Sequence, residues 1–154
     1  MTPELRDSYK IDKTGWGEGP WNSEPDRLDF HHAGFPCLAL RNHSGNWCGY
    51  VGLPAAHVYY RKDYGSLDLD VHGGLTYAGE CSGHICHVAE EGTDDMVWWL
   101  GFDCGHYCDY APGIAKHFRS HGLPGNIFDR GDYKTLEYVR GEIENLAVQL
   151  SQVK

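Results

Sequence analysis

The sequence is short of positive charge. Its 154 residues include 13 Lys and Arg against 22 Asp and Glu, which gives a formal net charge of −9. This deficit argues against stable nucleic-acid binding, because proteins bind a phosphate backbone through clustered Lys and Arg. Arg61 and Lys62 are the only adjacent basic residues. A small phosphorylated ligand needs only one or two cations, so a partner of that class stays open.

Long hydrophobic runs are also missing. No segment approaches the roughly 20 consecutive apolar residues of a membrane span, and the first residues lack the apolar region of a secretion signal. We therefore expect a cytoplasmic protein without membrane association. In that reducing compartment the six cysteines are expected to be free thiols or metal ligands rather than disulfides. The length predicts one domain over residues 1–154.

The residues that are abundant favour short strands and turns. The chain has 20 Gly, five Trp and ten Tyr, a composition that favours strands over a helical bundle. Phe35–Leu40 and Trp47–Leu53 flank turn residues and predict a β-hairpin. Val97–Cys104 is apolar on both faces, which indicates an interior strand. Leu67–Tyr77 alternates apolar and polar residues and predicts a second strand beside it.

One helix is strongly indicated at the C-terminal end. Apolar residues at spacings of three and four predict an amphipathic helix over residues 132–152, with Asp132 as its N-cap. The stripe is Leu136, Val139, Ile143, Leu146 and Leu150. This helix is expected to be structural and to pack on one face of the sheet, and a short helix is expected near Ile114–Ser120. Residues 1–26, rich in Gly, Pro and Trp, predict an irregular arm over the domain.

These elements together predict the fold class. Strands in the middle of the chain followed by a C-terminal helix favour an α+β domain with a mainly antiparallel sheet of about five or six strands. The helix then covers one face of that sheet. No internal repeat or low-complexity segment suggests another architecture.

Residues able to do chemistry stand near the ends of the two predicted neighbouring strands. His72 precedes two glycines in the first, and Asp103 and His106 close the second. A histidine held by a carboxylate transfers protons near neutral pH, so these three residues are the candidate catalytic groups. Cys104 beside His106 is an alternative nucleophile. The competing interpretation is that Asp103 and His106 only hydrogen-bond the backbone where the strand turns.

The loop after the hairpin supplies candidate ligand-binding residues. Aromatic faces beside two cations can hold a base and a phosphate, and the amides of a glycine pair can bind an oxygen. The predicted ligand-binding residues are His57, Tyr60, Arg61, Lys62, Gly73, Gly74 and Thr76. A solvated loop whose side chains cover core edges explains the same pattern.

Two sets of residues have the ligand types of a metal site. The first is the trio His72, Asp103 and His106, which offers the three protein ligands of a catalytic zinc or another divalent ion. The second is a structural zinc set, Cys81, Cys86, Cys104 and Cys108, with His87 as an alternative ligand to Cys86. Its C-x4-C and C-x3-C spacings are looser than the C-x2-C of zinc knuckles, so buried free thiols stay open as the alternative.

Four segments carry a resemblance to a known group of proteins. They are GYVGLP at 49–54, HGGLTY at 72–77, WWLGFDCGH at 98–106 and YKTLEYVRGEIENLAVQL at 133–150. The chain resembles a family of small bacteriophage and prophage proteins with HGGLT and WWxGFDCxH motifs, over roughly residues 26–150. The resemblance implies a phage origin and a small accessory protein in the host cytoplasm. It assigns no catalytic residue.

The resulting functional hypothesis is a small phage accessory protein with an anti-defence role. It is expected to bind a nucleotide-like phosphorylated ligand in a His and Asp pocket, and either to hydrolyse the ligand or to sequester it. An acidic inhibitor of a host protein is a further alternative, although the acidic residues are dispersed. A homo-oligomer is compatible with the sequence.

Overall fold

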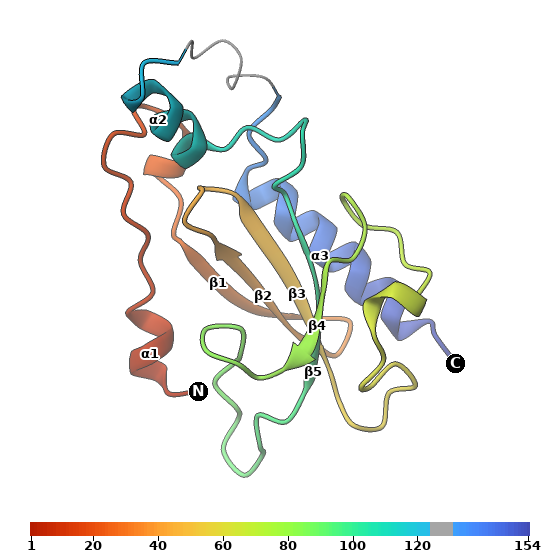
Figure 1. Ribbon diagram of the computed structural model, residues 1–154. Coiled ribbons are helices and arrows are strands. Elements are labelled where there is room, and N and C mark those ends of the chain that lie inside the picture. Colours follow the sequence, from red (N-terminus) through yellow and green to blue (C-terminus); the bar gives the residue numbers. More distant parts are fainter. Residues whose placement is uncertain (124–130) are drawn as a thin grey trace.

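The computed structural model describes residues 1–123 and 131–154 (Figure 1). Within these residues it shows one five-stranded open sheet with strand order β1-β2-β3-β5-β4, and all neighbouring strands are antiparallel. The strands are β1 (Arg27–His32), β2 (Phe35–Arg41), β3 (Trp47–Leu53), β4 (Tyr77–Glu80) and β5 (Trp98–Asp103). Helix α3 (Leu136–Ser151) packs across one face. The predicted α+β fold is confirmed.

The central strands arise from the apolar segments of the sequence. β2 and β3 form the predicted hairpin, in which Arg41 pairs with Trp47 next to the turn. β5 lies between β3 and β4, so it is the interior strand that its two apolar faces predict. Leu100 and Phe102 join the apolar cluster beneath α3, whereas Trp99 joins a second cluster on the opposite face. Alternation along one strand therefore builds both sides of the core.

Helix α3 buries the predicted stripe but begins later than predicted. Val139, Ile143, Leu146 and Leu150 are all fully buried against the sheet. The N-cap is Thr135, whose hydroxyl accepts the Tyr138 N–H, so the prediction of Asp132 as N-cap is wrong. Asp132 is instead extended, because its backbone bonds to the residues on either side of Asp109 in an isolated bridge.

The strand predicted at Leu67–Tyr77 is wrong for most of its length, since regular strand is present only at Tyr77–Glu80. The alternation itself is real, because three apolar side chains turn inward to the core. They are Leu67, Leu69 and Val71. The backbone of this segment lies along α3 and bonds to side chains there: Asp70 N–H donates to Gln149 Oε1 at 2.9 Å, and the Asn145 and Gln149 amides donate to the Asp70 carbonyl. Within the described part of the chain, the extended residues 67–71 pair with no strand, and a turn at His72 and Gly73 separates them from β4.

Two short helical elements lie between β3 and α3 in the sequence. α2 (Pro112–Ser120) begins two residues before the predicted Ile114, and a 3-10 turn, η2 (Tyr64–Ser66), precedes the extended segment along α3. Among residues 1–123 and 131–154, none of the helices has the length and apolar character that crossing a membrane requires.

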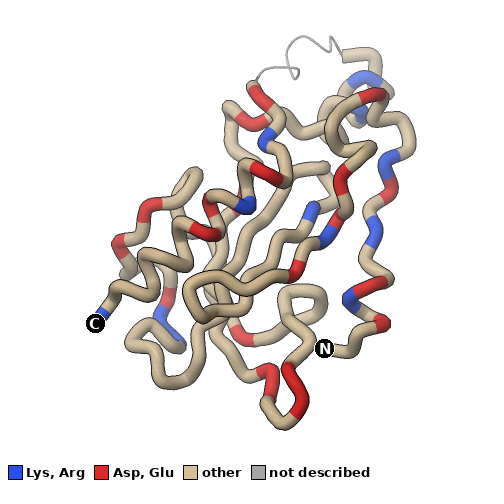
Figure 2. The backbone as a smooth tube through the Cα atoms, turned by 180° about the vertical axis from the view of Figure 1, so that it is seen from behind, with Lys and Arg blue, Asp and Glu red and all other residues tan. Residues whose placement is uncertain are grey.

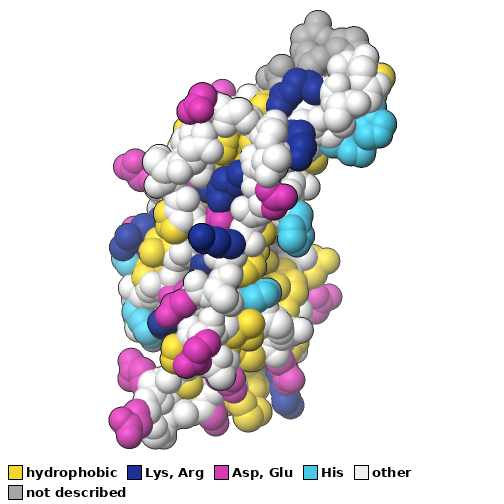
Figure 3. All heavy atoms as spheres, turned by 90° about the vertical axis from the view of Figure 1, so that its left-hand side faces the viewer, with side chains coloured by type: hydrophobic (Ala, Val, Ile, Leu, Met, Phe, Trp, Pro, Cys, Tyr) yellow, Lys and Arg dark blue, Asp and Glu magenta, His cyan; other side chains and the backbone are white. Residues whose placement is uncertain are grey.

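The first 26 residues contain a short helix, α1 (Pro3–Asp7), and a 3-10 turn, η1 (Pro20–Asn22), joined by irregular chain. This arm follows one side of the domain (Figure 1). Trp16 and Trp21 are buried there with Ile11 in a small apolar cluster. Figure 3 shows the arm side, where basic and acidic side chains lie next to one another.

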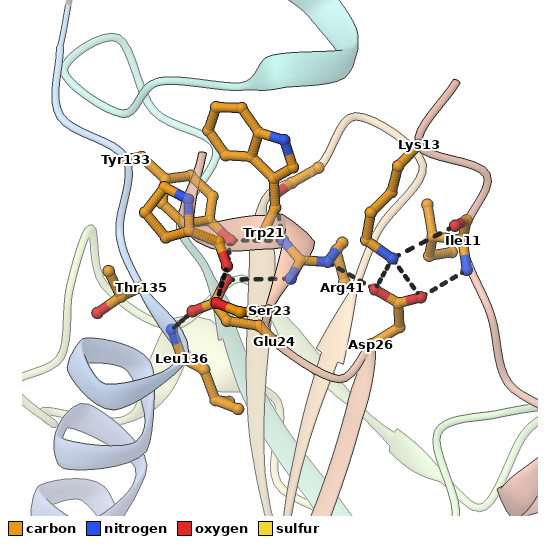
Figure 4. A network of polar contacts seen from close by, with 12 residues as sticks. Ile11, Lys13, Trp21, Ser23, Glu24, Asp26, Arg41, Tyr133, Thr135 and Leu136 are labelled. Atoms are coloured by element: carbon orange, nitrogen blue, oxygen red, sulfur yellow. Dashed lines mark hydrogen bonds and ion pairs between the residues drawn. The ribbon is translucent and has the colours of Figure 1, made fainter. Parts of the chain in front are cut away.

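A buried ion network connects the arm to the sheet and to the start of α3 (Figure 4). Arg41 on β2 is fully buried, and its guanidinium donates to Asp26 at 2.8 Å and to Glu24 at 3.1 Å. It also donates to the hydroxyl of Tyr133. Glu24 accepts the Leu136 N–H at 2.6 Å, at the first residue of α3. Because a buried charge without a partner is costly, this network holds the three segments in one arrangement.

Candidate functional site

Three segments that are distant in the sequence meet beyond the C-terminal end of β5. The turn between the extended segment and β4 carries His72, and the loop that follows β5 carries His106 and Asp109. The residues that lead into α3 and its first turn carry Lys134 and Tyr138. The side chains from all three segments contact one another, so they form one site.

His72 is held on both sides. Its Nε2 lies 2.7 Å from Asp109 Oδ2, and its Nδ1 lies 2.8 Å from the Tyr138 hydroxyl. A carboxylate only accepts, so Nε2 carries the proton donated to Asp109, and Nδ1 accepts from Tyr138. Burial and the neighbouring Glu142 raise the pKa of Tyr138, which keeps its hydroxyl protonated for this bond. Tyr138, His72 and Asp109 thus form a continuous hydrogen-bonded path, and the Tyr138 hydroxyl also lies 3.4 Å from Glu142 Oε1.

Asp109 is the buried end of this path, with a side chain only 1% exposed. Its Oδ2 also accepts the backbone N–H of His106 at 3.1 Å. Its Oδ1 has no hydrogen-bond partner among the described residues, but Lys134 Nζ lies 3.6 Å away and supplies a positive charge. One carboxylate therefore positions His72, the loop of His106 and a cation together.

His106 lies beside His72, with their ring centroids 5.7 Å apart. Its Nε2 is 3.6 Å from Asp103 Oδ1, and that oxygen also accepts from the Thr76 hydroxyl at 3.0 Å. The ring rests on Gly73, where a Cβ would come within 2.0 Å of Nε2 and where φ is +68°. Glycine is required at position 73, because an L side chain there would be strained and would also displace His106.

The structure brings together some of the predicted site residues. They are His72, Gly73, Thr76, Asp103 and His106, with Gly74 next to them in the chain. One pairing differs from the expectation, since His72 bonds to Asp109 and not to Asp103. The glycine pair forms a turn in which both residues have positive φ, so it redirects the chain without a strand bulge.

Four predicted ligand-binding residues lie elsewhere. His57 Nε2 is 2.8 Å from the carbonyl of Leu150, about 18 Å along α3 from Tyr138. The other three are near the start of β5, roughly 17 Å from its end at Asp103. Tyr60 packs on Trp98, Arg61 pairs with Glu80, and the Lys62 carbonyl accepts from Trp98 Nε1. The prediction that these four residues share a pocket with His72 is therefore wrong.

The sequence did not predict three residues of the site, which are Asp109, Lys134 and Tyr138. Asp109 follows His106 by three positions just as Asp103 precedes it by three, a symmetry that offered a weak signal. Lys134 and Tyr138 belong to a segment that its apolar stripe identified as structural. Their i and i+4 spacing was the available sign that one polar face also serves the site.

The structure does not bring the predicted catalytic metal ligands together. Among residues 1–123 and 131–154, the group that brings three donor atoms within 4.8 Å of one another is Cys81, Cys86 and Asp95. The trio His72, Asp103 and His106 does not form such a group in that part of the chain. Both ring nitrogens of His72 are engaged by Asp109 and Tyr138. In this arrangement neither ring nitrogen of His72 is left for a metal ion.

The cysteines also depart from expectation. Cys81 and Cys86 form a disulfide, whereas Cys37, Cys48, Cys104 and Cys108 are free. Cys104 is fully buried beneath α3, and burial raises the pKa of its thiol, so it is not an activated nucleophile. The predicted four-cysteine zinc set is not assembled, because Cys81 follows β4 beside the start of β5 and Cys104 follows the end of β5.

No protein-family model, curated protein or solved structure matches the chain. The resemblance to small phage proteins therefore stays a prediction. What the fold and the site define is an α+β protein with two adjacent histidines, each beside a carboxylate.

Proposed function

We propose that the protein binds a small nucleotide-like phosphorylated ligand at the His72 and His106 site and hydrolyses a phosphoester bond of it. In the phage setting that the sequence suggests, the ligand is a nucleotide-derived defence signal in the host cytoplasm. The observation that carries the proposal is the pair of adjacent imidazoles, 5.7 Å apart, each beside a carboxylate. Two such groups supply the acid and the base of a phosphoester hydrolysis.

The accessibility of the groups supports this assignment. The side chain of His106 is 38% exposed, so the outer part of its ring can meet a ligand, although its Nε2 is buried against Gly73. The side chain of His72 is 17% exposed. His72 instead reaches the surface through the hydroxyl of Tyr138, whose side chain is exposed. Asp103 and Asp109 are positioning residues for the two imidazoles.

The reaction balances without any further reactant. The oxygen of a water molecule forms a bond to phosphorus, and the ester P–O bond breaks. In this proposal the Tyr138 hydroxyl takes the proton of the water while its own proton passes to Nδ1 of His72, and Asp109 stabilises the resulting imidazolium. His106, which enters the step as the imidazolium, gives a proton to the leaving oxygen, and after product release solvent returns a proton from His72 to His106.

Groups for a phosphate and a base adjoin the imidazoles. Lys134, beside Asp109, is a cation for the phosphate, a role that the sequence assigned to Arg61 and Lys62. Tyr107, next to His106 in the chain, is 82% exposed and offers an aromatic face on which a base can stack. An exposed tyrosine of this size at the edge of a polar site is a natural platform for a nucleobase.

The test is incubation with a panel of cyclic and ADP-ribose-type nucleotides, with and without EDTA, followed by chromatography. We expect new products in both conditions. His106→Gln is expected to lower the rate by about 100-fold or more, because it removes the proton donor. Asp109→Asn is expected to lower it as well through misorientation of His72. The matched control is His31→Gln. His31 lies on β1, the edge strand at the other side of the sheet from β4 and β5, so this variant is expected to leave the rate unchanged.

The same experiment distinguishes hydrolysis from capture. Intact ligand that is recovered only after heat release shows sequestration and overturns the hydrolytic step. The absence of both product and retained ligand overturns the whole proposal. Equal activity of His106→Gln and the wild-type protein would place the chemistry elsewhere in the molecule.

A further inference from the structure

A second cluster of potential metal-ligating side chains lies near the N-terminus, away from the histidine site. Cys81 directly follows β4, and Cys86 and Asp95 lie in the loop that leads to β5. Figure 1 shows this loop beside the N-terminus, and Figure 2 shows the acidic residues gathered there. In the structure the two cysteines are joined as a disulfide.

We propose that the reduced form of this cluster binds a divalent ion of the zinc type through Cys81, Cys86 and Asp95. The disulfide and the metal site are mutually exclusive states of the same two sulfur atoms. Reduction of the disulfide by a dithiol or a phosphine adds two electrons and two protons and yields two thiols. Metal binding then releases both thiol protons, since the ligating species are thiolates.

The distances in the oxidised protein already approach those of a tetrahedral site. Asp95 Oδ2 lies 3.7 Å from the sulfur of Cys81 and 3.7 Å from that of Cys86. Metal–ligand bonds of about 2.3 Å to sulfur and 2.1 Å to oxygen place sulfur and oxygen about 3.6 Å apart around tetrahedral zinc. The carboxylate is therefore correctly spaced for both sulfurs. Only the two sulfurs must separate, to about 3.8 Å, when their bond is broken.

The loop that carries the cysteines does not depend on the disulfide for its shape. Ser82 and Ile85 form an antiparallel bridge with both backbone bonds at 3.0 Å. Arg27 on β1 donates to the carbonyls of His84 and Cys86 at 2.8 and 2.7 Å. These bonds keep the two cysteines close after reduction, which lowers the ordering cost of binding a metal.

The charges of the site change in the direction that a divalent ion requires. In the oxidised state the single carboxylate of Asp95 pairs with the Met1 amino group at 2.9 Å, and that group also lies 3.9 Å from the sulfur of Cys86. Two thiolates add two negative charges, and a divalent cation neutralises them. Three protein ligands leave one coordination position free.

That free position has space beside it. A cavity of about 210 Å³ adjoins the cluster. It is lined by Tyr60, Glu80, Cys81, Asp95, Met96 and Val97. A water molecule or a small ligand can therefore approach the cluster from the side of Cys81 and Asp95.

The test is a titration of the reduced protein with Co²⁺ under anaerobic conditions. We expect one ion per chain, with the thiolate-to-cobalt charge-transfer bands and the visible bands of tetrahedral Co²⁺, and loss of these bands when Zn²⁺ is added. The oxidised protein is expected to show none of them. Cys81→Ser is expected to abolish the bands, and Asp95→Asn to weaken binding by about tenfold or more.

Two controls separate this site from other thiols and from unfolding. Cys108→Ser removes the exposed free thiol and Cys48→Ser a half-buried one, and both are expected to bind Co²⁺ like the wild type. Circular dichroism verifies that each variant is folded before titration. Charge-transfer bands that persist in Cys81→Ser, that disappear in Cys108→Ser, or that are absent from the reduced wild type would each overturn the proposal. None of these outcomes depends on the histidine site.

Discussion

Replacement of Arg41 by Met is expected to destabilise the protein by about 3 kcal/mol, because it breaks a buried ion network. Arg41 is fully buried and contacts Asp26 and Glu24, whose side chains are 4% and 13% exposed. Removal of one partner of a buried pair costs roughly 3 to 5 kcal/mol. The lower end of this energy range applies to Arg41→Met, because two contacts stay in place (Figure 4). Lys13 still neutralises Asp26 at 2.6 Å, and Tyr133 still donates to Glu24.

Urea unfolding followed by circular dichroism measures this loss. A loss of about 3 kcal/mol is a large part of the roughly 5 to 15 kcal/mol that stabilises a typical domain. The matched control is Arg61→Met, which breaks an ion pair of 2.9 Å with Glu80 in which both side chains are more than half exposed. That exposed pair is expected to contribute less than about 1 kcal/mol. Equal losses in the two variants would refute the assignment of the stabilisation to buried charge.

Two further predictions concern acid stability and the histidine site. Burial raises the pKa of Asp26, but hydrogen bonds from Lys13, Ile11 and Arg41 outweigh burial and leave this pKa below its usual value. Ionised Asp26 therefore stabilises the fold above about pH 4 and loses this effect as the pH falls through its lowered pKa. Unfolding curves of Asp26→Asn between about pH 5 and pH 2 are expected to depend less on pH than those of the wild type; equal slopes would contradict this. Gly73→Ala is expected to cost about 1 to 2 kcal/mol and to move the His106 ring, so unshifted His106 imidazole NMR signals would contradict the contact.

Local pattern was enough to predict much of the fold. Apolar segments around a turn identified β2 and β3, and the spacing of Val139, Ile143, Leu146 and Leu150 identified the buried face of α3. Such patterns depend on neighbours in the chain, so they are visible without coordinates. The extended segment before β4 shows the limit. Its alternation was read correctly, but a strand also needs a partner strand, and α3 occupies that side.

The site shows the same division. The sequence by itself determined which residues have acid–base chemistry, and it placed His72, Asp103 and His106 near turns where such side chains can meet. Only the tertiary structure decided that His72 pairs with Asp109 and Tyr138, that Lys134 lies beside Asp109, and that Cys81 bonds to Cys86. Side-chain types and periodicity are properties of the chain, whereas the choice of partner depends on distances across space that packing alone sets.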